Sequence, residues 1–350
     1  MNNERSTILI AGGAGFVGSN LAVLLKTKYP QITVIALDNL MRRGSELNLS
    51  ALKEAGVEFI HGDIRNKEDL QFDEKIDIII DAAAEPSVLA GLNGSPDYLI
   101  NTNLNGTINL LSVANHHKAK FIFLSTSRIY PIAAIENIPY HETETRFEWD
   151  SFAGIDENFT LKGARSFYGT TKLAGELILQ EYETFSGLKA VINRCGVIAG
   201  PRQMGKVDQG VVVLWMARHF WKKSLSYIGY GGQGKQVRDC MHILDLFDLI
   251  DFEINNFEKV SGKVYNVGGG EKVSFSLLEL TLLCEKIMGN KIEISSVKET
   301  RSGDLPIYIT DNSFVAKEIG WTPKRDVETI LTDIYEWIKT DEKKLQSILK

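Results

Sequence analysis

Short apolar runs alternate with longer amphipathic segments along the first 194 residues of the chain. The runs are rich in strand-forming residues and occupy residues 7–11, 32–38, 57–61, 76–80, 120–124 and 189–194. Helix-like segments separate several of them, from just after Gly18 to about Lys28 and at residues 96–117 and 168–186. Residues 76–80 are almost continuously apolar, which is typical of a parallel strand buried on both faces. The pattern predicts an α/β fold with a doubly wound parallel sheet.

The pattern changes after residue 194. The elements expected there are shorter and are separated by glycine-rich loops at residues 200–205, 229–234 and 268–270. We therefore expect residues 1–194, joined by part of the later chain, to form a nucleotide-binding domain. Residues 195–350 should form a smaller lobe that mainly binds the substrate. The polar segment 130–166 is expected to be a loop excursion whose acidic side chains are mostly solvated.

A glycine-rich turn follows the first apolar run and opens the first helix. Gly12, Gly15 and Gly18 allow a tight turn and a close approach of the backbone to a ligand. The free N–H groups at the start of the helix favour a pyrophosphate. Asp38 ends the second run 20 residues beyond Gly18, where a carboxylate would meet a ribose hydroxyl. Together these features predict a dinucleotide site rather than a merely structural turn with a capping aspartate.

The choice of dinucleotide depends on the charges near Asp38. A carboxylate at this position would repel the extra phosphate of NADP, whereas Arg42 and Arg43 could attract it. We favour NAD. Asp63, after the third run, is placed to bind an adenine edge, and the small side chains of residues 82–84 would let the cofactor lie against the backbone.

Tyr168 and Lys172 stand four residues apart at the start of a predicted helix, so their side chains share one face. A phenol has a pKa of about 10, and a neighbouring ammonium lowers it enough for proton transfer near neutral pH. The spacing alone is weak evidence, because it occurs on many helices by chance. Thr126, at the end of the fifth run, would lie at the same ligand-binding edge of the sheet.

Composition and charge exclude several other functions. The chain has 350 residues, 44% of them hydrophobic, and a net charge of -6, which argues against general nucleic-acid binding. No apolar run approaches the roughly 20 residues that span a bilayer, and residues 1–6 do not resemble a signal peptide. The three cysteines, Cys195, Cys240 and Cys284, are far apart and are expected to be reduced. We expect a cytoplasmic protein with no membrane partner and no metal site.

Over nearly its whole length, the chain resembles the extended short-chain dehydrogenases/reductases. The motifs that carry this resemblance are Gly12, Gly15 and Gly18, Asp38, Gly62-Asp63-Ile64, Thr126, and Tyr168 to Lys172. The resemblance implies a Rossmann fold, bound NAD and a homodimer formed through residues 99–117 and 168–186. It implies that Tyr168 is the acid/base, that Lys172 lowers its pKa and holds the nicotinamide ribose, and that Thr126 binds the reacting sugar hydroxyl. The expected cofactor-binding residues are Gly12, Gly15, Phe16, Val17, Asp38, Asn39, Asp63, Ile64, Ala82, Ala83, Ala84, Asn103, Tyr168 and Lys172.

Within this family the substrate would be a nucleotide-sugar. A 4,6-dehydratase carries an Asp-Glu pair directly after the hydroxyl residue, whereas this chain has Ser127 and Arg128, which favours an epimerase. Segments around Glu142, Gln203, Asp208 and Gln236 resemble the CDP-paratose 2-epimerase branch, although Ser127-Arg128 and Cys195-Gly196-Val197 depart from its pattern. The expected substrate-binding residues are Thr126, Arg194, Gln203, Gln209, Gln236, Arg238, Arg301 and Asp304.

Two alternatives to a CDP-sugar 2-epimerase stay open. The first is a UDP-hexose 4-epimerase, which would use the same cofactor and the same acid/base. The second is a non-catalytic NAD-binding protein. This alternative is disfavoured because such proteins tend to lose the catalytic tyrosine and lysine, whereas this chain keeps both, as Tyr168 and Lys172.

Overall fold

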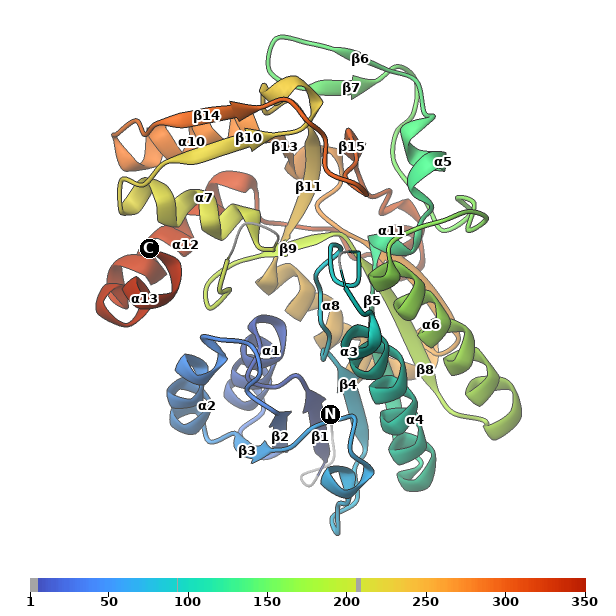
Figure 1. Cartoon of the computed structure of the whole chain (residues 1–350). Coiled ribbons are helices and arrows are strands. Elements are labelled where there is room, and N and C mark those ends of the chain that lie inside the picture. Colours follow the sequence, from blue (N-terminus) through green and yellow to red (C-terminus); the bar gives the residue numbers. More distant parts are fainter. Residues whose placement is uncertain (1–5, 93, 206–208) are drawn as a thin grey trace. The chain divides into compact units, whose positions relative to one another are not determined.

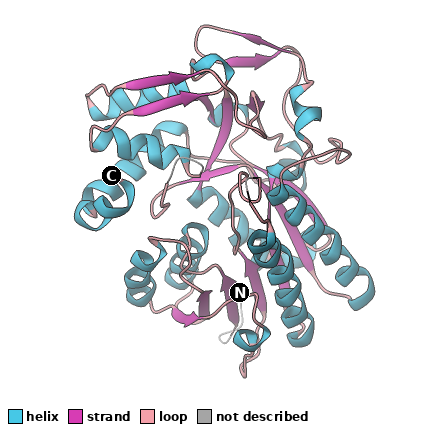
Figure 2. Ribbon diagram, viewed as in Figure 1, coloured by secondary structure: helices cyan, strands magenta, loops and turns pink. Residues whose placement is uncertain are grey.

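The computed structural model describes residues 6–92, 94–205 and 209–350, and the chain divides into two compact units (Figures 1 and 2). Unit 1 comprises Met1–Ile129, Phe167–Arg194 and Leu246–Tyr265, and unit 2 comprises Tyr130–Ser166, Cys195–Asp245 and Asn266–Lys350. The chain passes from unit 1 to unit 2 after Arg194, and a later segment returns to unit 1. The polar segment 130–166, which lies between two parts of unit 1 in the sequence, belongs to unit 2.

A seven-stranded sheet forms the centre of unit 1, in the order β3-β2-β1-β4-β5-β8-β12. Neighbouring strands are parallel from β3 through β2, β1 and β4 to β5. This arrangement confirms the predicted doubly wound parallel sheet, and the strand order reverses direction between β1 and β4. The strands are β1 (Thr7–Ala11), β2 (Thr33–Asp38), β3 (Glu58–His61), β4 (Ile78–Asp81), β5 (Lys120–Thr126), β8 (Ala190–Cys195) and β12 (Lys263–Val267).

Alternate residues of these strands point to opposite faces of the sheet. On one face Leu9, Ile79 and Phe121 form a buried core with Leu110 of α4 and Leu179 of α6. On the opposite face the buried Asn193 of β8 contacts Glu253 of α8. The helices with residues in unit 1 are α1 (Phe16–Lys28), α2 (Leu49–Ala55), α3 (Asp97–Ile100), α4 (Gly106–His117), α6 (Phe167–Ser186), α8 (Ile243–Asn255) and α9 (Phe257–Val260).

The helix expected at residues 96–117 is present, but it contains a wider turn. Between α3 and α4 the backbone passes through a π-helical segment at Asn101–Asn105. The side chain of Asn109 donates to the carbonyl oxygen of Ile64 at 2.9 Å, and the buried Asn103 bonds to the loop that follows β4. Two asparagines that are poor helix formers are therefore explained by tertiary hydrogen bonds.

Unit 2 contains smaller sheets. Strand β11 is paired with β13, β15 and β9, and separate pairs are formed by β10 with β14 and by β6 with β7. Its strands are β6 (Tyr140–Glu142), β7 (Phe147–Trp149), β9 (Val197–Ala199), β10 (Leu225–Ile228), β11 (Val237–His242), β13 (Ser274–Ser276), β14 (Ile294–Val297) and β15 (Ile307–Tyr308). Its helices are α5 (Ile132–Glu136), α7 (Val211–Phe220), α10 (Leu277–Met288), α11 (Ser313–Ile319), α12 (Val327–Thr340) and α13 (Glu342–Leu349).

The segment 130–166 is more ordered than the loop expected from its polar sequence. It contains α5 and the antiparallel hairpin of β6 and β7. The hairpin is anchored because Phe147 is buried against Val237 and Ile307. The acidic side chains Glu142, Glu144 and Asp150 are exposed, as expected.

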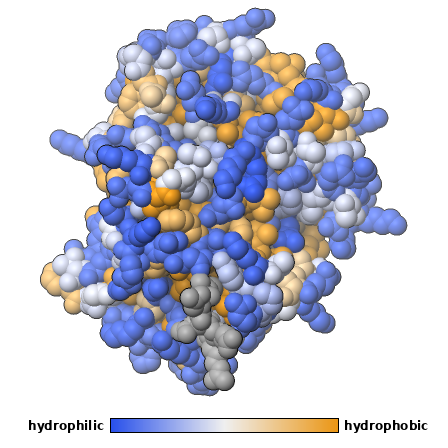
Figure 3. All heavy atoms as spheres, turned by 180° about the vertical axis from the view of Figure 1, so that it is seen from behind, coloured by the Kyte–Doolittle hydropathy of each residue, from blue (hydrophilic) through white to orange (hydrophobic). Residues whose placement is uncertain are grey.

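The surface is mainly polar. Figure 3 shows one face on which hydrophilic residues predominate and hydrophobic residues form separate patches. None of the helices in the described part of the chain combines the length and apolar character that crossing a bilayer requires. All three cysteines are buried, and none of them forms a disulfide bond within the described part of the chain.

Glu253 provides a test of the packing between β8 and α8. Its carboxyl is buried, accepts a hydrogen bond from Asn193 at 3.0 Å, and burial raises its pKa to about 8. The folded protein therefore holds the carboxyl proton of Glu253 more tightly than the unfolded chain does. As a result, the contribution of Glu253 to the free energy of unfolding falls as pH rises from 4.5 to about 8.

We predict that Glu253→Gln raises the free energy of unfolding by roughly 1–3 kcal/mol at about pH 8.5, because a neutral amide keeps the hydrogen bond without ionising. The gain should shrink towards about pH 5. Thermal unfolding of both proteins across this pH range measures it, and a gain that does not depend on pH would contradict the prediction.

Candidate functional site

The turn between β1 and α1 is shaped by its glycines. Gly12 has a φ of +72°, and its carbonyl oxygen accepts a hydrogen bond from the N–H of Gly15 at 3.0 Å. A Cβ at Gly12 would lie 2.8 Å from the carbonyl oxygen of Ala82, and one at Gly18 would collide with the carbonyl oxygen of Gly12. Gly15 at the start of α1 has no side chain that could cap the helix, and the free N–H groups at a helix start suit a pyrophosphate. Phe16 and Val17 form this first turn and are partly exposed.

Asp38 lies against this turn. One carboxylate oxygen accepts the N–H of Ala14 at 3.0 Å and the other accepts the N–H of Leu40 at 2.8 Å. Burial raises the pKa of Asp38, and these backbone donors oppose the rise. A carboxylate held in this way keeps lone pairs for ribose hydroxyls, and the ribose contact expected of Asp38 stays a prediction.

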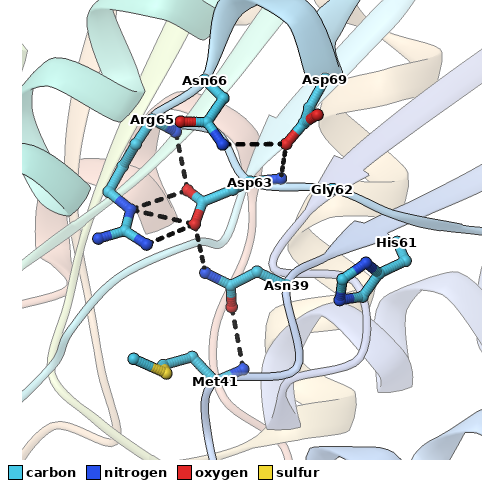
Figure 4. Close-up of a pocket in the computed structure, with 8 residues that line it drawn as sticks. All are labelled: Asn39, Met41, His61, Gly62, Asp63, Arg65, Asn66 and Asp69. Atoms are coloured by element: carbon cyan, nitrogen blue, oxygen red, sulfur yellow. Dashed lines mark hydrogen bonds and ion pairs between the residues drawn. The ribbon is translucent and has the colours of Figure 1, made fainter.

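Asn39 and Asp63 line a pocket of about 340 Å³ in unit 1 (Figure 4). The side chain of Asn39 donates to Asp63 at 2.9 Å, and Arg65 forms an ion pair with Asp63 at 2.6 Å. The hydrogen bond from Arg65, with that from Asn39, lowers the pKa of Asp63 to about 2. The next residue, Ile64, is buried against Gly106. The other residues that line the pocket are Met41, His61, Gly62, Asn66 and Asp69.

The loop after β4 is fixed by Asn103. Ala82, Ala83 and Ala84 are partly exposed. Asn103 has no exposed surface, and its amide accepts the N–H of Glu85 at 2.8 Å and donates to the carbonyl of Glu85 at 3.0 Å. Both ends of the Asn103 amide therefore hold the loop, so the structure favours a positioning role for this residue.

Tyr168, Lys172 and Thr126 lie on elements that pack together. Tyr168 and Lys172 are in the first turns of α6, which packs against β5 and against the turn Ser127–Ile129 that follows it. Tyr168 is half-buried, whereas Lys172 is 2% exposed and its ammonium lies 4.6 Å from the ring centroid of Phe123. Thr126 is buried at the end of β5, and its hydroxyl accepts the N–H of Arg128 at 3.2 Å.

Arg194 lies in unit 1 and is held by an ion pair. Its guanidinium contacts the carboxylate of Glu176 at 2.8 Å, and the same carboxylate accepts the hydroxyl hydrogen of Ser125. All three side chains are buried. The network ties α6 to β5 and β8, whereas the substrate contact expected of Arg194 stays a prediction.

The remaining predicted substrate residues lie in unit 2. Arg238 pairs with Asp304 at 2.7 Å, and the N–H of Asp304 bonds to the carbonyl of Arg301, so these three residues are brought together. Gln203 and Gln236 each donate to a backbone carbonyl, and their amide oxygens are buried without a partner among the described residues. Gln209 is partly buried, next to Gly210, which packs on Gln203. Asp208 lies outside the described residues.

Comparison with known proteins agrees with this geometry. Residues 8–268 match the NAD dependent epimerase/dehydratase family. The chain is 32% identical to the CDP-paratose 2-epimerase of Salmonella typhi over 94% of this chain and 98% of that protein. It is 27% identical to the UDP-glucose 4-epimerase of Erwinia amylovora, over 95% of this chain and 97% of that protein. The UDP-glucuronic acid 4-epimerase of Bacillus cereus, solved with UDP-glucuronic acid and NAD, superposes with a TM-score of 0.78 at 26% identity, over 95% of this chain and 99% of that one.

The chain therefore belongs to the NAD dependent epimerase/dehydratase family and is an enzyme whose cofactor is NAD. The glycine turn and Asp38 fit this cofactor, because the turn leaves room for the backbone to meet a pyrophosphate and Asp38 presents a carboxylate beside it. The sequence reasoning missed Asp81, Ser125 and Glu176. Glu176 could have been found, because it follows Lys172 by four residues and so shares the face of α6 on which Tyr168 and Lys172 lie.

The glycine turn generates the next prediction. Gly18→Ala should weaken NAD binding by at least about tenfold, because the new Cβ would displace the carbonyl of Gly12 and with it the turn. Titration calorimetry with NAD measures the affinity. Gly94→Ala is the matched control, since a Cβ there meets no atom within 4 Å. Equal affinities for the two variants would show that the turn does not bind the cofactor.

Proposed function

We propose that the chain is an NAD-dependent nucleotide-sugar epimerase that inverts C2 of a CDP-linked deoxyhexose, as in the conversion of CDP-paratose to CDP-tyvelose. The observation that carries this proposal is the pair Tyr168 and Lys172 on α6, packed against the strand that ends in Thr126. Ser127 and Arg128 follow Thr126, so the Asp-Glu pair of a dehydratase is missing at these positions. Tyr168 is then the acid/base that serves the sugar.

The proposed reaction needs one proton acceptor and one hydride acceptor. The phenolate of Tyr168 takes the proton of the carbinol O–H, and Lys172 stabilises the phenolate by its positive charge. NAD, when bound, would supply the hydride chemistry, which is the acceptance and return of the hydride of the carbinol carbon. The keto sugar presents its opposite face before the return, and Tyr168 gives the proton back. Atoms and electrons balance over the cycle, so the net change is an inverted carbon.

The choice of CDP and of C2 is supported by the relative from Salmonella typhi, which matches almost from end to end. Gln203 and Gln236 also present buried amide oxygens with free acceptor capacity, which suits recognition of a nucleobase or sugar. Arg238 and Arg301 would bind the diphosphate, since a guanidinium reaches two phosphate oxygens. A UDP-hexose 4-epimerase is the second candidate, because two of the similar enzymes are named for UDP-sugars.

We also propose that the enzyme is a cytoplasmic homodimer formed through α4 and α6. Large apolar side chains are exposed on α6, including Phe167 (41%), Leu177 (56%) and Phe185 (81%). A second copy of the chain would cover them, which removes their apolar surface from water.

A panel of nucleotide-sugars tests the substrate. We predict that the purified enzyme converts CDP-paratose and leaves UDP-glucose unchanged, as followed by NMR. In deuterated water the inverted carbon should carry no deuterium, because the hydride never exchanges with solvent. Turnover of UDP-glucose alone would establish the second candidate, and deuterium at the inverted carbon would defeat the hydride mechanism.

Replacing the acid/base tests the mechanism. Tyr168→Phe should lower kcat/KM by about 10²- to 10⁴-fold while leaving NAD affinity nearly unchanged, because the ring stays and only the proton-transfer group is lost. Turnover assays and calorimetry measure the two quantities. Tyr182→Phe, at a partly buried tyrosine later on the same helix, is the matched control and should keep full activity. Normal turnover by Tyr168→Phe would exclude Tyr168 as the acid/base.

A further inference from the structure

Asp81 is a buried carboxyl group at the end of β4 to which no role has yet been given. Its side chain has no exposed surface. Ile79, two residues earlier, belongs to the core that α4 and α6 cover, so Asp81 points to the same face. The register of β4 and β5 places Asp81 directly beside Phe123, which also belongs to that face.

The immediate surroundings of Asp81 combine hydrogen bonds with one cation. The hydroxyl of Thr107 on α4 donates to one carboxyl oxygen at 2.7 Å, and the N–H of Ala83 donates to the other at 3.2 Å. The ammonium of Lys172 lies over the ring of Phe123, which is the neighbour of Asp81 across the sheet, and it acts on Asp81 electrostatically. Burial raises the pKa of Asp81, and the charge of Lys172 is the main influence that opposes this rise.

Lys172 needs an anion because its side chain is 2% exposed. An ammonium that has lost its water is costly to keep charged, and an aromatic ring compensates only part of that cost. Two other carboxylates on nearby elements have partners of their own. Glu176 is paired with Arg194 and Ser125, and the carboxylate of Glu85 accepts the N–H of Ser87. Among the described residues, Asp81 is a fully buried carboxyl group on which the charge of Lys172 acts directly.

We propose that Asp81 is the buried counter-ion of Lys172 and keeps its ammonium charged beneath Tyr168. Asp81 is then a positioning residue, since it acts on the reaction through Lys172. The proposal rests on the proposed function, in which the charge of Lys172 allows Tyr168 to lose its proton. Without Asp81 the buried lysine would release its own proton, and the phenol would return towards its ordinary pKa.

Asp81→Asn tests this idea because the amide keeps the shape of the side chain and an oxygen for Thr107 but removes the charge. The readout is the titration of Tyr168 in the NAD-bound protein, followed by the ultraviolet absorbance of the phenolate. Subtracting the titration of the matching Tyr168→Phe protein isolates Tyr168 from the other tyrosines, of which the chain has 11 in all.

We expect Asp81→Asn to raise the pKa of Tyr168 by about 1 or more, which is about a tenfold rise in proton affinity. Asp77→Asn is the matched control. Asp77 precedes the same strand, is 31% exposed and pairs with Lys75 at 3.0 Å, so its loss should leave Tyr168 unchanged. An unchanged or lower pKa of Tyr168 in Asp81→Asn would overturn the proposal.

A stability measurement covers the case in which Asp81→Asn folds poorly. Removing one partner of a buried ion pair destabilises the protein, because the other charge stays buried and uncompensated. Removing both partners leaves no buried charge, so part of the lost stability returns. The double variant Asp81→Asn/Lys172→Met should therefore melt at a higher temperature than Asp81→Asn alone. Additive losses of stability would show that the two groups do not form a pair. Neither the titration nor the melting measurement needs a substrate. An error in the proposed sugar would therefore change only the result of the substrate panel, and the two proposals can fail independently.

Discussion

The face of the sheet that α4 and α6 cover changes from apolar to polar along its strands, and the rest of unit 1 depends on this change. Leu9, Ile79 and Phe121 pack against the helices near the middle of the strands. At the carboxyl ends the same face carries Asp81, Ser125 and Arg194. Polar groups so deeply buried must be hydrogen-bonded or paired, and each of these three is. The pairing fixes α6 against the sheet at the level where the cofactor and sugar would meet.

This arrangement explains why the helix that carries Tyr168 and Lys172 is held rigidly. Glu176 continues the same helical face and binds Arg194 and Ser125, so α6 cannot rotate or slide without breaking a buried ion pair. Ser125 is the neighbour of Thr126 in the sequence, which places Thr126 on a strand tied directly to α6. A preorganised acid/base requires such support from residues that never touch the substrate.

Much of unit 1 could be predicted from sequence because its signals are local. The apolar runs, the glycine turn and Asp38 follow from periodicity and spacing, and the structure confirms the parallel sheet. The segment 130–166 was harder, because the single buried ring of Phe147 anchors its hairpin against residues about 90 and 160 positions later. The partners of Arg194 and Asp81 were also missed. From sequence alone, an arginine or aspartate can equally be a substrate-binding residue or one partner of a buried ion pair. Only the tertiary structure shows which of the two roles it has.

The wider turn at Asn101–Asn105 has a consequence for how this helix is built. A π-helical turn amounts to one residue inserted into an α-helix, which advances everything on one side by about 100° relative to the other. Asn103, inside this turn, bonds to the loop after β4, and Thr107, one turn later, bonds to Asp81. The helical stretch that runs from α3 to α4 thus holds both the loop after β4 and the buried carboxyl group of Asp81, and its π-helical turn lies where the first of these contacts is made.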